Sequence, residues 1–489
     1  MRKLIILLCI LFIPAVAAAQ APAFAEYFTG DSMRLDLYQI GDAKEEIITL
    51  DEIYREGAWP GSRSALIDPF GYGRYAVKVY DAATKKPIYS RGFDCMFGEY
   101  RTTKPALDGV KRVFQRSVRV PWPKQPVVVA IDLRDRQNVF HELSRWPVDP
   151  NDYHIIKETV NAGDWVYEAL KSGDPENKVD LAFIAEGYAA GDRDKFKADV
   201  DRAVGWLFSY EPYKHLKGSF NIYGVFRPSP ERAMDEPRQG VFRKTVLGAS
   251  FNAFDTDRYM LVAEGHRLRE IAAQVPYDTI VVLVNSKRYG GGGIYNDYCI
   301  TTVDNDRSKA VFIHEFGHNF AGLADEYYTS DVAYNDFYPK GVEPLEPNIT
   351  ALLDRKHVKW ADLVSPGIPI PTEYGKEERE ALQAERQKNR QARAKELAAA
   401  KAKNAPEAET KAIEARYAEM DKPIAAKLQA LQTKYASLQD KVGAFEGAGY
   451  ASKGLYRPAW YCIMISNPKD EFCPVCQRAI EQMIRHYEQ

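Results

Sequence analysis

The stretch His314-Glu315-Phe316-Gly317-His318, continuing through Asn319-Phe320-Ala321-Gly322-Leu323-Ala324-Asp325-Glu326-Tyr327, decides how this sequence is interpreted. Its two histidines are one helical turn apart on one face, so both imidazoles can reach the same metal ion. Gly322 can end such a helix and turn the chain back, which brings acidic residues toward the ion as a third ligand. The pattern predicts a catalytic zinc site and favours a protease.

Each residue of this motif has an expected role. We predict that His314 and His318 bind zinc, and that Glu315 is the general base, which takes a proton from water and passes it to the leaving amine. Three protein ligands would leave the fourth zinc position for water, whose pKa falls to about 7. The third ligand is open between Asp325 and Glu326, because the chain cannot easily aim both at one ion. Of the two, Asp325 is preferred.

The run from His318 to Tyr327 resembles the metzincin signature, with one extra residue before the glycine, and is similar to the IgA-peptidase family of bacterial zinc metallopeptidases. Residues 181–188 resemble the start of that family's catalytic domain. Residues 454–458 and 462–464 resemble its downstream segment. The resemblance covers roughly residues 160–489 apart from a helical insertion, and extends more weakly to an N-terminal β-sandwich.

The resemblance implies a metzincin-like α/β zinc peptidase domain. It implies Asp325 as the third ligand, and Met464 as the methionine of a Met-turn, an apolar floor under the metal. The one-residue shift of Gly322 and Asp325 is a departure from the usual metzincin spacing.

Other residues are candidates for contact with the substrate. A tyrosine could stabilise the oxyanion, and the sequence does not choose among Tyr327, Tyr328 and Tyr461. Gly290 to Gly293 are expected in a loop after a strand, where a glycine backbone could approach something closely. A substrate strand bound by Gly291, Gly292 and Gly293 is one interpretation, and a surface loop is the other.

The composition changes along the chain predict a multidomain protein. We expect a signal peptide at residues 1–19, a β-sandwich domain at 20–158 and the catalytic domain at 159–489. Alternation of apolar and polar residues predicts strands at 33–38 and 75–80 of the first domain, and a short apolar run predicts another at 126–133. Residues 161–178 are expected to lead into the second domain.

In the second domain, strands and helices alternate, which predicts an α/β sheet carrying the motif helix. Expected strands cover residues 179–184, 220–226 and 279–284, and expected helices cover residues 192–209 and 257–274. Residues 373–442 are rich in Ala, Glu, Lys, Arg and Gln, with a heptad-like spacing from Ile424 onward. These residues predict an inserted antiparallel helical hairpin, which is either a solvated spacer or an element that docks a partner or acts as a lid.

Five cysteines follow the expected signal peptide: Cys95, Cys299, Cys462, Cys473 and Cys476. Their odd number leaves at least one thiol free or paired between chains. The Cys473-Pro474-Val475-Cys476 pair favours a structural role over redox chemistry. A four-thiolate metal site of Cys299, Cys462, Cys473 and Cys476 is a second interpretation.

The near-neutral net charge of −2 gives no indication of nucleic-acid binding. We therefore expect an exported zinc endopeptidase that acts on proteins or glycoproteins in the periplasm, at the cell surface or outside the cell, and no transmembrane segment. An alternative is a surface protein that binds glycan or glycoprotein through its β-sandwich, with the zinc domain trimming what is held. A third hypothesis is a scaffold built on the helical hairpin.

Overall fold

The computed structural model describes residues 22–157, 163–328, 337–465 and 470–489. The expected signal peptide therefore lies outside the described residues. Among those residues, no helix combines the length and the apolar character that a membrane crossing needs.

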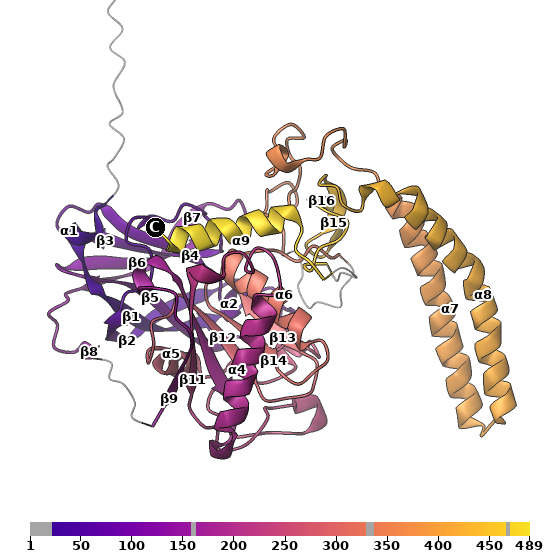
Figure 1. Ribbon diagram of the computed structural model, residues 1–489, viewed down its shortest axis with the longest axis horizontal. Helices are drawn as coiled ribbons and strands as arrows, with labels where there is room; N and C mark the ends of the chain where they lie inside the picture. The colour runs from indigo at the N-terminus through magenta and orange to yellow at the C-terminus, as the bar shows by residue number, and fades with distance from the viewer. Residues whose placement is uncertain (1–21, 158–162, 329–336, 466–469) are drawn as a thin grey trace, which may run out of the picture.

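The N-terminal part consists mainly of strands arranged in two sheets (Figure 1). The first sheet has the order β5-β1-β2-β8 and the second the order β4-β3-β6-β7. The side chains of both sheets meet in one shared hydrophobic core, which contains Leu35 of β1 and Val129 of β6. The strands are β1 (Phe28–Gly41), β2 (Glu46–Ala58), β3 (Tyr75–Asp81), β4 (Pro87–Phe93), β5 (Arg112–Pro123), β6 (Val127–Arg134), β7 (Phe140–Val148) and β8 (Ile156–Lys157), with short helices α1 (Phe24–Tyr27), α2 (Met96–Tyr100) and α3 (Lys104–Leu107).

The second part is built on a mixed sheet with the order β13-β14-β12-β10-β11-β9. Its central strands β14, β12, β10 and β11 are parallel, and the two edge strands are antiparallel to their neighbours. Parallel strands buried on both faces are apolar along their whole length, and every residue of β12 is buried. The strands are β9 (Trp165–Leu170), β10 (Val179–Glu186), β11 (Phe220–Phe226), β12 (Thr279–Val284), β13 (Gly291–Ile294) and β14 (Tyr298–Thr302).

Helices cover both faces of this sheet. One core contains the inward side chains of α4 (Arg193–Leu207), α6 (Ser308–Ala321) and α9 (Pro474–Tyr487). The core on the other face contains those of α5 (Gly265–Ala272). The helix with the two histidines, α6, is therefore held against the sheet next to β13 and β14 (Figure 1).

Two expectations about this domain are wrong. Residues 257–264 are not helical, and only α5 forms within the helix expected at 257–274. Tyr259 instead forms a bridge to Gly291, and Leu261 a bridge to Ser250, so pairing with distant backbone overrides the local helical pattern. The expected glycine loop is also partly a strand, since Gly291 to Gly293 pair with β14 as part of β13. β9, within the segment expected to lead into the domain, is an edge strand of the sheet.

The N-terminal sheet β5-β1-β2-β8 packs on the second domain through charged residues. Arg116 forms an ion pair with Asp297 at 2.6 Å, and the imidazole Nε2 of His266 lies 3.0 Å from the Leu37 carbonyl. The other N-terminal sheet contacts α9 of the second domain, where Arg91 of β4 donates to the hydroxyl of Tyr487. Charged side chains such as Arg91, Arg116 and Asp297 are thus buried between the two parts.

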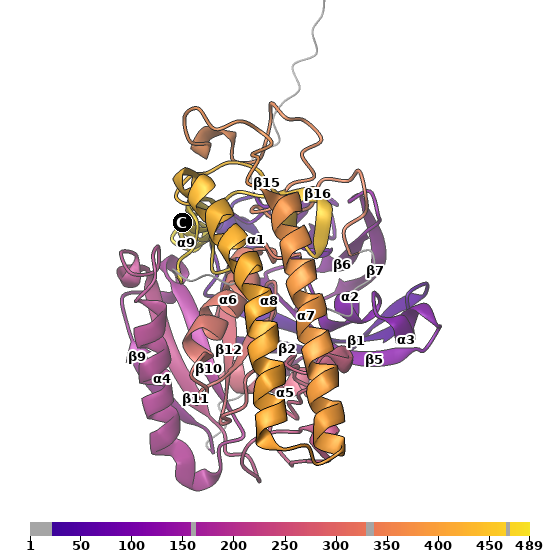
Figure 2. The ribbon, with the colours of Figure 1, turned by 90° about the vertical axis from the view of Figure 1, so that its right-hand side faces the viewer.

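The segment expected to form a helical hairpin contains α7 (Lys376–Ala402) and α8 (Glu407–Lys434). The two helices lie side by side in both views and project from the body of the molecule (Figures 1 and 2). Leu382 of α7 packs against Ile424 and Leu431 of α8. A small sheet of β15 (Phe445–Ala448) and β16 (Ala451–Arg457) follows the hairpin.

Candidate active site

Helix α6 presents its apolar side chains to the sheet and its histidines to the opposite side. Phe312, Phe316 and Phe320 are buried in the core, where the Phe316 ring is tilted against Phe312 and stacked on Phe320. The helix ends at Gly322, whose φ of +61° is the left-handed conformation that glycine adopts without strain. The chain turns there and returns past the exposed side of the histidines.

This turn brings three ligand atoms together. The Nε2 atoms of His314 and His318 are 3.1 Å apart, and Asp325 Oδ1 lies 3.1 Å from the first and 3.3 Å from the second. Glu326 is 0% exposed and faces away from this group. The structure thus brings Asp325, rather than Glu326, to the histidines.

Backbone carbonyls fix both imidazoles. His314 Nδ1 lies 3.0 Å from the Ile463 carbonyl, and His318 Nδ1 lies 2.5 Å from the Leu323 carbonyl. A carbonyl oxygen can only accept, so each Nδ1 carries a proton, and the neutral form of each ring has its lone pair on Nε2. Both lone pairs therefore face the shared point, as metal ligation requires.

The carboxylate of Asp325 is buried with only one of its oxygens hydrogen-bonded. Its Oδ2 accepts from the Tyr450 hydroxyl, whereas its Oδ1 accepts no hydrogen bond within the described part of the chain. Burial disfavours the charged form, but the nearby His318 and His314 hold the pKa of Asp325 well below its usual range. Burial also opposes the charged form of His318, yet the charge of Asp325 raises the pKa of that imidazole to about 9, so a metal ion that binds there must displace a proton from Nε2. A buried anion with an unpaired oxygen beside two lone pairs fits a bound cation.

Glu315 completes the group around the histidines. Its carboxylate oxygen lies within 4.8 Å of the ligand nitrogens of both His314 and His318, and its side chain is nearly buried at 7% exposure. Asp325 Oδ1 is the closer carboxylate, because it is within 3.3 Å of both nitrogens. Glu315 is thus placed beside the metal-binding point with its carboxylate free for another task.

Met464 lies under the helix that carries the histidines. It is 0% exposed, and its sulfur would be only 3.1 Å from a Cβ built on Gly317. The carbonyl of Met464 accepts from the Glu326 amide at 2.9 Å. The segment 462–464 therefore contacts α6, supports His314 through Ile463 and holds the chain next to Asp325.

The three candidate glycines have different surroundings. A Cβ on Gly293 would be 2.2 Å from the Glu315 carbonyl, and one on Gly291 would be 2.5 Å from Val311, so both glycines let β13 lie against α6. Gly291 also exchanges backbone hydrogen bonds with Arg258 and Met260, which takes the edge position that a substrate strand would need there. Gly293 lines the hollow in front of the histidines, and Gly291 and Gly292 do not.

Two hollows meet at His314 and Glu315. The first, the N-terminal hollow, is bordered by His314, Glu315 and His318 together with Arg74, Asp94 and Glu99 of the N-terminal part. The second, the hairpin hollow, also borders His314 and Glu315 and extends to Arg379 and Gln383 of α7 and to Trp460. A long ligand could thus cross the site from the N-terminal part to the hairpin.

The candidate tyrosines divide between these hollows. The Tyr327 ring lies parallel to the His314 imidazole with ring centres 6.4 Å apart, and it borders both hollows. Tyr328 and Tyr461 border only the hairpin hollow, and the Tyr461 hydroxyl accepts from Gln432 of α8 at 2.6 Å. Tyr327 is therefore the candidate that lies beside the histidines.

Sequence reasoning did not find Tyr450 or Arg258. Tyr450 is 125 positions from Asp325 in the chain, so no local spacing indicates their contact. Arg258 borders both hollows, and its Nη2 lies 3.5 Å from the Tyr327 hydroxyl. Burial lowers the pKa of Arg258, but the charges of Tyr327 and Glu315 outweigh it and raise that pKa above its usual value. The sequence analysis assigned Arg258 only to the helix expected at 257–274, and the structure has no helix at residue 258.

Comparison with known families agrees with these features. Residues 167–484 match the family model described as IgA Peptidase M64, and residues 23–145 match the model described as Peptidase M64 N-terminus. No curated protein matches the chain. M64 peptidases are metallopeptidases, which agrees with the metal-ligating group on α6, and a peptidase has a protein substrate. Because the first model covers more than half of the sequence, the chain belongs to the IgA peptidase M64 family.

Proposed function

We propose that this protein is an exported zinc-dependent endopeptidase that hydrolyses peptide bonds of proteins or glycoproteins. The observation that carries the proposal is the convergence of His314 Nε2, His318 Nε2 and Asp325 Oδ1 within 3.1–3.3 Å of one another. Ligands about 2.0–2.2 Å from a tetrahedral zinc ion are separated by about 3.3–3.6 Å, close to these distances. The metal would be held by two histidines and one carboxylate, with a fourth position open.

Zinc bound there would polarise the scissile carbonyl and lower the pKa of a water molecule to about 7. The carboxylate of Glu315 would accept a proton from the attacking water and deliver it to the leaving amine. Because Glu315 is nearly buried, bulk water competes little for this proton. Tyr327 and the cationic Arg258 are the donors best placed to stabilise negative charge on the substrate oxygen.

We further propose that the domain is metzincin-like, with Met464 as the apolar floor of the site. Its burial under Gly317 and the support of His314 by the adjacent Ile463 carbonyl favour this role. In the same way, two strand-rich sheets around one core favour a β-sandwich for the N-terminal domain. Export rests on the signal-like composition of residues 1–19.

An endopeptidase needs room for chain on both sides of the scissile bond. The N-terminal hollow and the hairpin hollow both open on His314 and Glu315, which supports cleavage within a polypeptide rather than at its end. Of the three candidate glycines, Gly293 is proposed to contact the substrate.

The test is Glu315→Gln. We expect this chain to keep one equivalent of zinc at the histidines and to lose at least about 100-fold in kcat, since general acid–base catalysis contributes about that much or more. Glu419→Gln on the exposed hairpin is the matched control and should keep full activity. Full proteolysis by Glu315→Gln would disprove the mechanism.

A second candidate function is recognition of a glycoprotein by the N-terminal domain, with the zinc domain trimming what is held. Arg74, Asp94 and Glu99 favour it, because they bring that domain to the edge of the active-site hollow. Deleting the whole domain would expose the charged interface at Arg116, so point substitutions are the better test. If Arg74→Ala lowers cleavage of glycoproteins but leaves short peptides unaffected, the domain selects substrates.

A further inference from the structure

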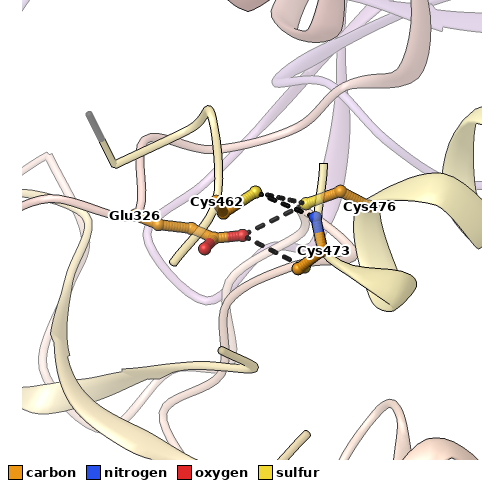
Figure 3. Close-up of side chains that lie close together, drawn as sticks. All are labelled: Glu326, Cys462, Cys473 and Cys476. Atoms are coloured by element: carbon orange, nitrogen blue, oxygen red, sulfur yellow. Dashed lines mark hydrogen bonds between the residues drawn. The ribbon is translucent and has the colours of Figure 1, made fainter. Parts of the chain in front are cut away.

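A second group of metal-ligating side chains lies outside the active site. It consists of Glu326, Cys462, Cys473 and Cys476, whose ligand atoms are all within 4.8 Å of one another. Their side chains converge from three segments: the chain after α6, the chain after β16, and the start of α9 (Figure 3). All four are at most 4% exposed, so the cluster is sealed inside the core.

We propose that Glu326, Cys462, Cys473 and Cys476 bind a second zinc ion with a structural role. Two sulfurs about 2.3 Å from a tetrahedral zinc ion are about 3.8 Å apart, and Cys462 Sγ and Cys476 Sγ are 3.7 Å apart. Glu326 Oε1 lies 3.1 Å from Cys476 Sγ and 4.0 Å from Cys473 Sγ, which brackets the spacing of an oxygen and a sulfur on one ion. Four protein donors fill the coordination shell, as in structural rather than catalytic zinc sites.

The carboxylate of Glu326 is incompletely satisfied without a cation. Asn348 donates to its Oε1 at 2.9 Å, but within the described residues its Oε2 has no hydrogen-bond partner although it is fully buried. The other groups in contact with this carboxylate are the thiols of Cys473 and Cys476, which are weak donors. A buried carboxylate with such neighbours costs free energy that a bound dication would offset.

The start of α9 suits two of the thiolates. Cys473 is the N-cap of this helix and Cys476 is in its first turn, so both lie at the positive end of the helix dipole. The Cys473 amide also donates to Cys462 Sγ at 3.4 Å. Two cysteines separated by two residues have the spacing common in zinc sites.

The structure disagrees with the four-thiolate interpretation of the sequence, because Glu326 and not Cys299 is the fourth member. Cys299 lies on β14 in the core and is outside the cluster. All five described cysteines are free thiols, and the 3.7 Å between Cys462 and Cys476 far exceeds a disulfide bond of about 2.05 Å. Soft thiolates select zinc over calcium or magnesium.

The second ion would tie together the two segments that form the active site. Glu326 follows Asp325 directly, and Cys462 precedes Ile463 and Met464, which support His314 and the floor of the site. Zinc between Glu326 and Cys462 would thus fix both segments without contacting the substrate.

The experiment is zinc analysis of the full chain, purified in zinc-containing buffer, beside the double variant His314→Ala/His318→Ala. We expect two equivalents of zinc in the unchanged protein and one in the double variant. X-ray absorption of the double variant should show sulfur neighbours at about 2.3 Å. This readout needs no activity and no substitution in the cysteine cluster, so it does not depend on a cluster variant that folds.

Further variants separate the alternatives. Cys299→Ser should keep both equivalents of zinc. Glu326→Gln should lose one equivalent of zinc at a lower chelator concentration than the unchanged protein does. The second site would be overturned if the double histidine variant bound no zinc. It would also be overturned if the mass of the chain were lower by two hydrogens because of a disulfide in the cluster. If the unchanged protein and the double variant both hold one sulfur-bound zinc, the second site stands and the catalytic zinc does not.

Discussion

Asp325 and Glu326 are consecutive in the chain, yet their carboxylates face two different groups of metal-ligating side chains. Asp325 Oδ1 lies 3.1 Å from His314 Nε2 in the active site, and Glu326 Oε1 lies 3.1 Å from Cys476 Sγ in the buried cluster. The sequence offered both carboxylates for one ion. In the structure each group receives one of the two carboxylates, so substitutions of Asp325 and Glu326 can be used to test the two groups separately.

The first prediction concerns Asp325. Asp325→Asn replaces the anionic oxygen with a neutral amide of the same shape, so we expect zinc affinity at the histidines to fall by more than the roughly 10–100-fold typical of outer-shell changes. Competition with a zinc chelator measures it. Asp354→Asn, at an exposed aspartate paired with His357, is the control. Unchanged affinity in Asp325→Asn would show that another residue is the third ligand.

The second prediction concerns Tyr450, whose hydroxyl donates to Asp325 Oδ2. Tyr450→Phe removes the donor and keeps the ring, so Asp325 loses the contact that orients it. We expect a loss of about 10–100-fold in zinc affinity or kcat/KM. Tyr417→Phe on the hairpin, where the hydroxyl donates to Glu396, should change neither quantity. If both variants behave alike, Tyr450 does not orient the ligand.

The parts of the fold that could be predicted are those encoded locally. The His314–His318 spacing, the turn at Gly322, and the strands at 220–226 and 279–284 follow from short-range patterns, and the structure has them in those places. Periodicity within a few residues is enough to specify such elements.

The rest depended on contacts between distant segments. Residues 257–264 have a helical pattern, but pairing of Tyr259 with Gly291 decides their conformation. Neither the Tyr450–Asp325 contact nor the meeting of Glu326 with Cys476 leaves a local signal, since the partners are 125 and 150 positions apart. The charge of Arg116 predicts exposure, but its ion pair with Asp297 of the second domain lets it be buried between the domains.

The third prediction concerns the base of the helical hairpin. Arg379 of α7 borders the hairpin hollow, with its guanidinium carbon 5.0 Å from the centre of the Trp460 ring. An acidic substrate residue in this hollow would lie beside a fixed positive charge, and interactions with charged groups contribute about 1.5–3 kcal/mol. Arg379→Ala should therefore lower kcat/KM at least about tenfold for peptides with an acidic residue on that side. Arg390→Ala, exposed on the same helix, is the control, and equal loss for neutral peptides would contradict the role.

The last prediction concerns stability against pH. His486 of α9 is buried against Arg91 of β4, with Nη1 of the arginine 3.2 Å from His486 Nε2. The arginine donates there, so the imidazole is neutral. Burial, reinforced by the charge of Arg91, lowers the pKa of His486 to about 3.

An unfolded chain would take up this proton near pH 6.5, while the folded chain does not until about pH 3. The unfolded state therefore binds more protons in this window, and the free energy of unfolding falls as the pH decreases. Between pH 7 and pH 5 the expected loss of unfolding free energy from His486 is about 2 kcal/mol.

His486→Gln keeps an acceptor for Arg91 but cannot titrate, so its unfolding free energy should fall by about 2 kcal/mol less than that of the unchanged protein over the same range. Denaturant unfolding at both pH values measures the difference, and His357→Gln, at an exposed histidine, should follow the unchanged protein. If His486→Gln shows the same pH dependence as the unchanged protein, the contact with Arg91 does not hold a neutral imidazole.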